Sequence, residues 1–438
     1  MAALVRGAVL FALAIGLMLP SAIAVAQNNA QHLGVASCSG SNCHGAAERP
    51  RGSYVPGNEY IIWSTRDKHR QAYTVLQGER AVRMARALGY PDAVNQKICL
   101  DCHADNVPQE QRGREFQISD GVGCEACHGG AQNWLGTHIS GATHRDNLAA
   151  GLFPTEQPLA RAEKCLSCHF GDSTKFVDHR LIGAGHPRLP FELDTFTSTE
   201  PAHYVVDRGY VERKGRVTDL QVWATGQAVA LYRRMDALLD PRHGRRGMFP
   251  EFALFDCQGC HHPYDSLHAP LPTGTGLGPG TAKLNDANAV MLETAAARLA
   301  PGAAAAVNAH LAALQRTTEI DPAAMPREAQ ALRQVARSLA NEAAIHEYSP
   351  AEIRALADSV IAVGSGPDEW RFAHAEQTTM ALEAVVAQLR SSGQLDSRQD
   401  AAVKKALDDL FASFANEASF RSDNFAAALR EFQRALHG

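Results

Sequence analysis

The stretch CLDCH, residues 99–103, places two cysteines three positions apart and a histidine directly after the second cysteine. The chain repeats this arrangement: all ten cysteines fall into five close pairs, and a histidine follows each pair at once. Four pairs have the C-x-x-C-H spacing, and the first pair has two more residues between its cysteines. In chain order the five motifs are CSGSNCH (38–44), CLDCH (99–103), CEACH (124–128), CLSCH (165–169) and CQGCH (257–261). Any interpretation has to explain the histidines as well as the thiols.

Three kinds of chemistry use paired cysteines. Disulfides are the ordinary fate of cysteines in an exported protein, but they do not require a histidine after each pair. Two pairs can form the tetrahedral thiolate shell of a zinc site, yet five pairs do not divide into such sites. Covalent haem attachment explains both features, because the thiols add to the porphyrin vinyl groups and the adjacent imidazole lies under the iron. The pattern therefore predicts haem c.

We expect five covalently attached haems, one at each motif. In CSGSNCH, the two extra small polar residues can bulge outward without changing the Cys43 and His44 end. The alternative for this motif is a disulfide between Cys38 and Cys43 with His44 on the surface, which leaves four haems. The expected attachment residues are Cys38, Cys43, Cys99, Cys102, Cys124, Cys127, Cys165, Cys168, Cys257 and Cys260, and the expected proximal ligands are His44, His103, His128, His169 and His261.

Five irons need up to five further axial ligands, and 14 of the 19 histidines lie outside the motifs. His69 shares a helical face with Tyr73 and Leu76, so its imidazole is expected to point inward. His138 and His144 follow the third motif in one loop, and we expect one of them to be a ligand. The full set of distal candidates is His69, His138, His144, His179, His186 and His203.

The spacing of the motifs constrains the architecture. From Cys38 to His261 there are about 45 residues per motif, too few for separate cytochrome domains, so the haems are expected to share one fold. Only 25 residues separate Cys102 from Cys127, which brings the second and third haems close together. Closely packed redox centres form a path for electrons. The expected fold class is mainly α, with a loop-rich multihaem domain of stacked haems followed by a helical bundle.

Composition divides the chain into four parts. Residues 1–26 combine a short apolar run with small residues at the end, which is typical of a cleaved export signal. Residues 27–268 hold all the motifs and an amphipathic stretch at 217–239, which is predicted to be a helix. Residues 269–281 are a linker rich in Pro and Gly, and 282–438 are an Ala-rich bundle of five to seven helices.

Export and charge limit the partners of the protein. The mature protein is expected to be periplasmic or otherwise exported and to have no transmembrane segment, because the apolar run of the signal is too short to span a bilayer comfortably. The formal charge of −5 argues against a nucleic-acid partner. The expected partners are redox proteins, an electron donor and an electron acceptor.

Part of the chain resembles a known family. The stretch GVGCEACHG (121–129), the helical histidine in WSTRDKHRQAY and the order of the C-x-x-C-H sites are similar to the tetrahaem cytochrome that accepts electrons from hydroxylamine oxidoreductase in nitrifying bacteria. The resemblance covers roughly residues 38–205. It implies a helical, loop-rich fold, stacked haem pairs, mainly bis-histidine iron and a periplasmic relay role. In that family one haem lacks a distal protein ligand.

This chain departs from the family pattern in its fifth motif, its longer first motif and its C-terminal bundle, so the hydroxylamine pathway is not carried over. Two functions compete. The first is an electron carrier with bis-histidine haems, and the second is an oxidoreductase for a small nitrogen or sulfur oxide with one five-coordinate haem. In the second case Arg188 and Tyr204 are candidate helpers; otherwise Arg188 is expected to pair with a haem propionate and Tyr204 to pack. Whether the protein is an enzyme stays open, with the carrier favoured.

Overall fold

The computed structural model describes residues 29–49, 51, 55–244, 250–261, 282–318, 320–365 and 372–438. The expected export signal and the expected Pro/Gly linker lie outside these residues. Within the described part the fold is mainly helical, as expected, and extended pairing is limited to isolated bridges such as the one between His32 and Arg112. No described helix is both long enough and apolar enough to cross a membrane.

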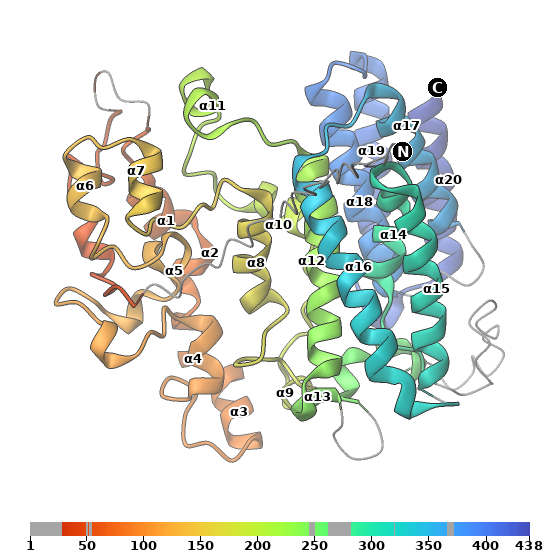
Figure 1. The fold of residues 1–438 in the computed structure, drawn as a ribbon, viewed down its shortest axis with the longest axis horizontal. Coiled ribbons are helices and arrows are strands. Elements are labelled where there is room, and N and C mark those ends of the chain that lie inside the picture. The colour runs from red at the N-terminus through yellow and green to blue at the C-terminus, as the bar shows by residue number, and fades with distance from the viewer. Residues whose placement is uncertain are drawn as a thin grey trace, which may run out of the picture.

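The N-terminal part consists of short helices joined by loops, and it holds the first four motifs (Figure 1). Its helices are α1 (Glu59–Arg66), α2 (Lys68–Gln71), α3 (Glu79–Ala87), α4 (Lys97–His103), α5 (Cys124–His128), α6 (Leu135–Ile139), α7 (His144–Ala149), α8 (Pro158–His169), α9 (His179–Gly183), α10 (Leu193–Thr199) and α11 (Arg208–Lys214). The second and fourth motifs are the C-terminal ends of α4 and α8, and the third motif makes up the whole of α5. Because helix residues three and four apart share a face, both thiols and the histidine of each motif point to one side.

The C-terminal part is a bundle of longer helices on the opposite side of the molecule (Figure 1). It follows α12 (Asp219–Leu239) and α13 (Pro241–Gly244), and its helices are α14 (Ala287–Leu299), α15 (Pro301–Thr317), α16 (Met325–Ile345), α17 (Pro350–Gly364), α18 (Phe372–Ser391), α19 (Ser397–Ser413) and α20 (Ser422–His437). These are seven α-helices in the described part of 282–438, the upper end of the expected range. α17 begins at a capping box, with Ser349 and Glu352 bonded to each other's backbone N–H groups.

Helix α12 lies between the two parts. It begins at a capping box in which the Gln221 N–H donates to the Thr218 hydroxyl and the Thr218 N–H donates to the Gln221 side chain. Trp223 belongs to the core formed with α17 and α18, and Val229 to the core formed with α8 and α16. Because cores form on two sides of α12, even its polar residues Thr225 and Gln227 are buried. The predicted helix at 217–239 is therefore present, and both parts of the molecule share it.

Candidate haem-binding sites

The first motif forms a turn that brings His44 back to Cys38. The His44 N–H donates to the Cys38 carbonyl oxygen at 3.2 Å, although the two residues are six positions apart. In the fifth motif, with ordinary spacing, the His261 N–H donates to the Cys257 carbonyl oxygen at 2.7 Å. The two extra residues of CSGSNCH thus bulge out while the histidine keeps its hydrogen bond to the first cysteine. No disulfide joins any of the ten motif cysteines, the first pair included.

Every motif histidine has a second histidine ring at nearly the same distance. The ring centres are separated by 5.9 Å for His44 and His138, 6.3 Å for His103 and His186, 6.4 Å for His128 and His203, 6.1 Å for His169 and His69, and 6.2 Å for His261 and His179. An imidazole nitrogen lies about 2 Å from a coordinated metal, and the ring centre is about 1 Å further away. Two imidazoles on opposite sides of one iron therefore have centres about 6 Å apart. The five pairs fit this requirement.

Hydrogen bonds at Nδ1 leave Nε2, the other ring nitrogen, available to bind a metal. Nδ1 of His103 donates to the Ala72 carbonyl oxygen at 2.8 Å, and Nδ1 of His186 donates to the Pro187 carbonyl oxygen at 2.7 Å. Nδ1 of His44 lies 3.0 Å from a carboxylate oxygen of Glu59. Metal-bound histidines use their second nitrogen in this way, which fixes the tautomer and the ring orientation. In each of these rings Nε2 is the nitrogen that would be left to bind a metal.

Burial keeps several of these histidine rings neutral, which is the form that binds a metal. It lowers the pKa of His128 and of His169 to about 4, so both imidazoles are neutral at ordinary pH. A neutral imidazole has the lone pair that a metal needs. Burial likewise lowers the pKa of His138 and of His186.

His144 has a different environment from the paired histidines. Its Nε2 lies 2.9 Å from an oxygen of Glu156, and both side chains are largely buried. Within the described residues, no ring contact joins it to a motif histidine. Of the two candidates in this loop, the geometry supports His138.

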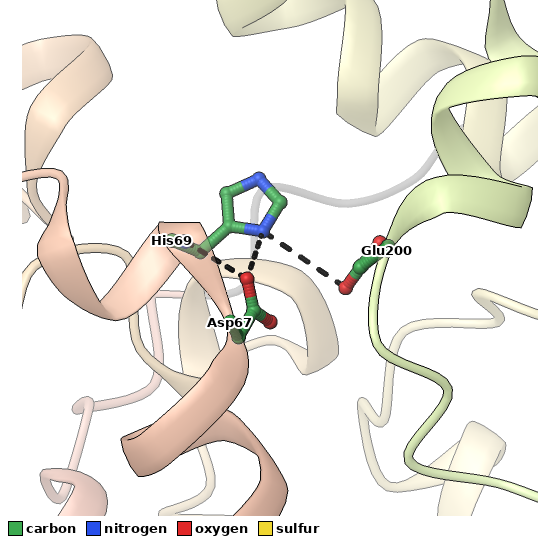
Figure 2. A group of neighbouring side chains, drawn as sticks. All are labelled: Asp67, His69 and Glu200. Carbon is green, nitrogen blue, oxygen red and sulfur yellow. Dashed lines mark hydrogen bonds and ion pairs between the residues drawn. The ribbon is translucent and has the colours of Figure 1, made fainter.

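A group of three side chains surrounds His69 (Figure 2). Nδ1 of His69 lies 3.1 Å from Oδ1 of Asp67 and 3.9 Å from Oε1 of Glu200. Burial opposes the charge on Asp67, but its hydrogen bonds with His69 lower its pKa. The hydrogen bond between the Asp67 carboxylate and the His69 ring raises the pKa of His69. Neither carboxylate was expected from the sequence; Asp67 stands two positions before His69, which is the one local signal that could have indicated it.

The fifth motif lies against the helical bundle. The backbone N–H of Phe372, the first residue of α18, donates to the Gln258 side chain at 2.9 Å. Nearby, Arg188 donates to Glu376 at 2.6 and 2.8 Å and to Glu417 at 2.9 Å. Both carboxylates come from the bundle, so Arg188 links the two parts of the protein. Tyr204 packs against His203, with 5.8 Å between the ring centres.

Comparison with known proteins agrees with this geometry. Residues 37–129 match the family described as cytochrome c554 and c-prime. No curated protein and no solved structure matches the chain. The matched segment contains the first three motifs and His69. Residues 37–129 are therefore similar to the c554-like multihaem cytochrome family, and this similarity supports a c-type cytochrome with covalently bound haem c and a role in electron transfer.

Proposed function

We propose that the protein is a pentahaem c-type cytochrome that carries electrons between redox partner proteins through five bis-histidine irons. The observation that supports it most strongly is the set of five histidine pairs, each with one motif histidine and one distal candidate. Haem c, when bound, supplies iron that alternates between the ferric and ferrous states. The role of the chain is to hold, orient and bury these groups.

The proposed distal partners, in the order of the motifs, are His138 for the first, His186 for the second, His203 for the third, His69 for the fourth and His179 for the fifth. Because every motif histidine has a partner, the arrangement favours the electron carrier over an oxidoreductase with an open iron. Arg188, a candidate helper for such an enzyme, is instead bonded to two carboxylates of the bundle.

The order of the motifs in space differs from their order along the chain. The Cys38 thiol raises the pKa of Cys124 and the Cys124 thiol lowers the pKa of Cys38, so these thiols are neighbours and the first and third motifs lie close together. Cys102 and Cys168 shift each other's pKa in the same way, and Sγ of Cys168 lies 3.9 Å from the Asp101 carbonyl oxygen, so the second and fourth motifs are also neighbours. The Cys127 thiol interacts electrostatically with Cys165, which joins the third motif to the fourth. These contacts support stacked haem groups rather than isolated ones.

The fifth site continues this series. His179 is the first residue of α9, and His186 lies three residues after the end of α9. One short segment therefore supplies a histidine to both the fifth and the second site. The proposed path for electrons is first, third, fourth, second and fifth motif. This path runs from the loop-rich end of the protein to the face of the helical bundle.

We propose that the bundle is a structural or docking module. In this proposal the multihaem domain ends at residue 268 and the bundle begins at residue 282.

The test is intact mass together with electron paramagnetic resonance (EPR) of the mature protein, produced with a haem-maturation system. We expect five haems, loss of residues 1–26 and only low-spin iron in the oxidised state. The double variant Cys38→Ser and Cys43→Ser should lose one haem. A wild-type mass with four haems contradicts attachment at CSGSNCH, and a stoichiometric high-spin signal that responds to cyanide contradicts the bis-histidine assignment. Periplasmic export predicts that the mature protein appears in the periplasmic fraction.

A further inference from the structure

The cluster of Asp67, His69 and Glu200 has the composition of a small metal site, but its geometry indicates another role. Both carboxylates approach the same ring nitrogen, Nδ1, at 3.1 and 3.9 Å. Figure 2 shows the second ring nitrogen pointing away from both of them. The ring of His169 lies 6.1 Å from that of His69. The carboxylates are thus placed to act on the fourth iron through His69.

Asp67 is held firmly in this position. Its side chain is 5% exposed, and its Oδ1 also accepts a hydrogen bond of 2.8 Å from the backbone N–H of His69. Asp67 is the N-cap of α2, so the helix start fixes the carboxylate next to the ring. Glu200 follows the last residue of α10 and is more exposed.

The second site provides a contrast within the same molecule. Both of its imidazoles, His103 and His186, donate to backbone carbonyl oxygens, which are neutral acceptors. A charged acceptor strengthens the hydrogen bond and makes the imidazole a better electron donor to the metal. Negative charge at this position also favours the ferric state over the ferrous state, which carries one positive charge less.

A nearby cation acts in the opposite direction. The Lys175 ammonium lies 3.0 Å from Sγ of Cys168 and 3.1 Å from the carbonyl oxygen of Asp101, between the second and fourth motifs. Its positive charge favours the ferrous state at both sites. Because the two sites share Lys175, it does not cancel the difference that the carboxylates make at the fourth site alone.

We propose that Asp67, assisted by Glu200, is a positioning residue that increases electron donation by His69 and keeps the fourth haem at a lower reduction potential than the second. This inference rests on the proposed function, in which His69 is the distal ligand of the fourth iron. Second-shell hydrogen bonding is one of the established ways in which a protein sets the potential of a haem. The first site, with Glu59 at Nδ1 of His44, has a carboxylate acceptor of the same kind.

The test is Asp67→Asn, followed by a potentiometric titration monitored by absorbance and EPR. Asparagine has the same shape and also caps helices, so the fold and the low-spin signal should be retained. We expect one of the five redox components to move to higher potential by about tenfold in its equilibrium constant, about 59 mV for one electron. Glu200→Gln should move the same component in the same direction by less, because its carboxylate is further from the ring.

The matched control is Glu328→Gln in the helical bundle. Glu328 is a largely buried carboxylate that lies 3.0 Å from Nδ1 of His310, a histidine outside the five pairs. This variant should leave all five redox components at their wild-type potentials. An equal shift in the Glu328 variant, or no shift in the Asp67 variant, overturns the inference.

His69→Ala separates this inference from the proposed function. If His69 is the distal ligand, its removal produces one high-spin iron. A wholly low-spin spectrum of this variant contradicts the ligand assignment and with it the inference. A high-spin signal in His69→Ala together with an unchanged potential in Asp67→Asn overturns the role of Asp67 but leaves His69 as the distal ligand.

Discussion

His138 and His144 lie six positions apart in neighbouring short helices, but their side chains face different partners. The His138 ring lies 5.9 Å from that of His44, whereas His144 bonds to the buried carboxylate of Glu156 at 2.9 Å. We expect His138→Ala to open one coordination position at the first iron and to convert it to high spin. His144→Ala should leave the spectrum unchanged and lower the free energy of unfolding by about 1–3 kcal/mol, because it leaves a buried carboxylate without its partner.

EPR spectra and denaturant titrations of the two variants check this prediction. His144→Ala is the control for His138→Ala, because both remove an imidazole from the same loop. A high-spin signal in the His144 variant, with none in the His138 variant, would reverse the assignment.

The same two residues show what the sequence can predict and what it cannot. The sequence predicts that this loop supplies one ligand, because a histidine in a loop after a motif can reach a neighbouring iron. It could not choose between the two, because the choice depends on His44, which is 94 positions earlier in the chain. Glu200 was missed for the same reason, since α2 and the end of α10 meet only in the folded molecule. Asp67 stands two positions before His69, but a single nearby carboxylate is too weak a pattern to predict a contact. The motif residues could be proposed from the sequence because the spacing of the two thiols and the histidine is local.

At the scale of elements, α10 packs closely across α12 at Gly226. A Cβ atom at Gly226 would lie 2.6 Å from Cβ of Leu193, which is much closer than carbon atoms approach. We expect Gly226→Ala to force these helices apart and to lower the free energy of unfolding by about 1–3 kcal/mol. Urea unfolding followed by circular dichroism measures the change.

Gly302 in α15 is the matched control for Gly226. It also lies in a helix, it is exposed, and nothing lies within 4 Å of the position of its missing Cβ. Gly302→Ala should therefore stabilise the protein, by up to about 1 kcal/mol, because alanine favours the helical state. Equal effects of the two substitutions would contradict the close packing of α10 on α12.

The periodicity of residues 217–239 predicted α12 almost to its ends, since the capping residue Thr218 and the apolar spacing are local signals. In the structure α12 forms cores with α16, α17 and α18. An amphipathic pattern indicates that one face of a helix is buried, but it does not say which partners bury it.

At the scale of the whole molecule, the five histidine pairs fall into two classes by the angle between their ring planes. The planes are near parallel, at 15° and 25°, for the first and fifth sites. They are near perpendicular, at 85° to 89°, for the second, third and fourth sites. Hydrogen bonds from Nδ1 to fixed backbone oxygens hold both rings of the second site, so its angle is a property of the fold.

These angles predict the EPR spectrum of the oxidised protein. Perpendicular imidazole planes leave two iron d orbitals nearly equal in energy and give a signal with one very large g value, whereas parallel planes separate the orbitals and give a rhombic signal. We expect three signals of the first type and two of the second. His203→Ala should remove one large-g signal and His138→Ala one rhombic signal, because these residues serve sites of different class. Five rhombic signals would contradict the ring orientations, and loss of the same signal in both variants would contradict the pairing of these two histidines with separate irons.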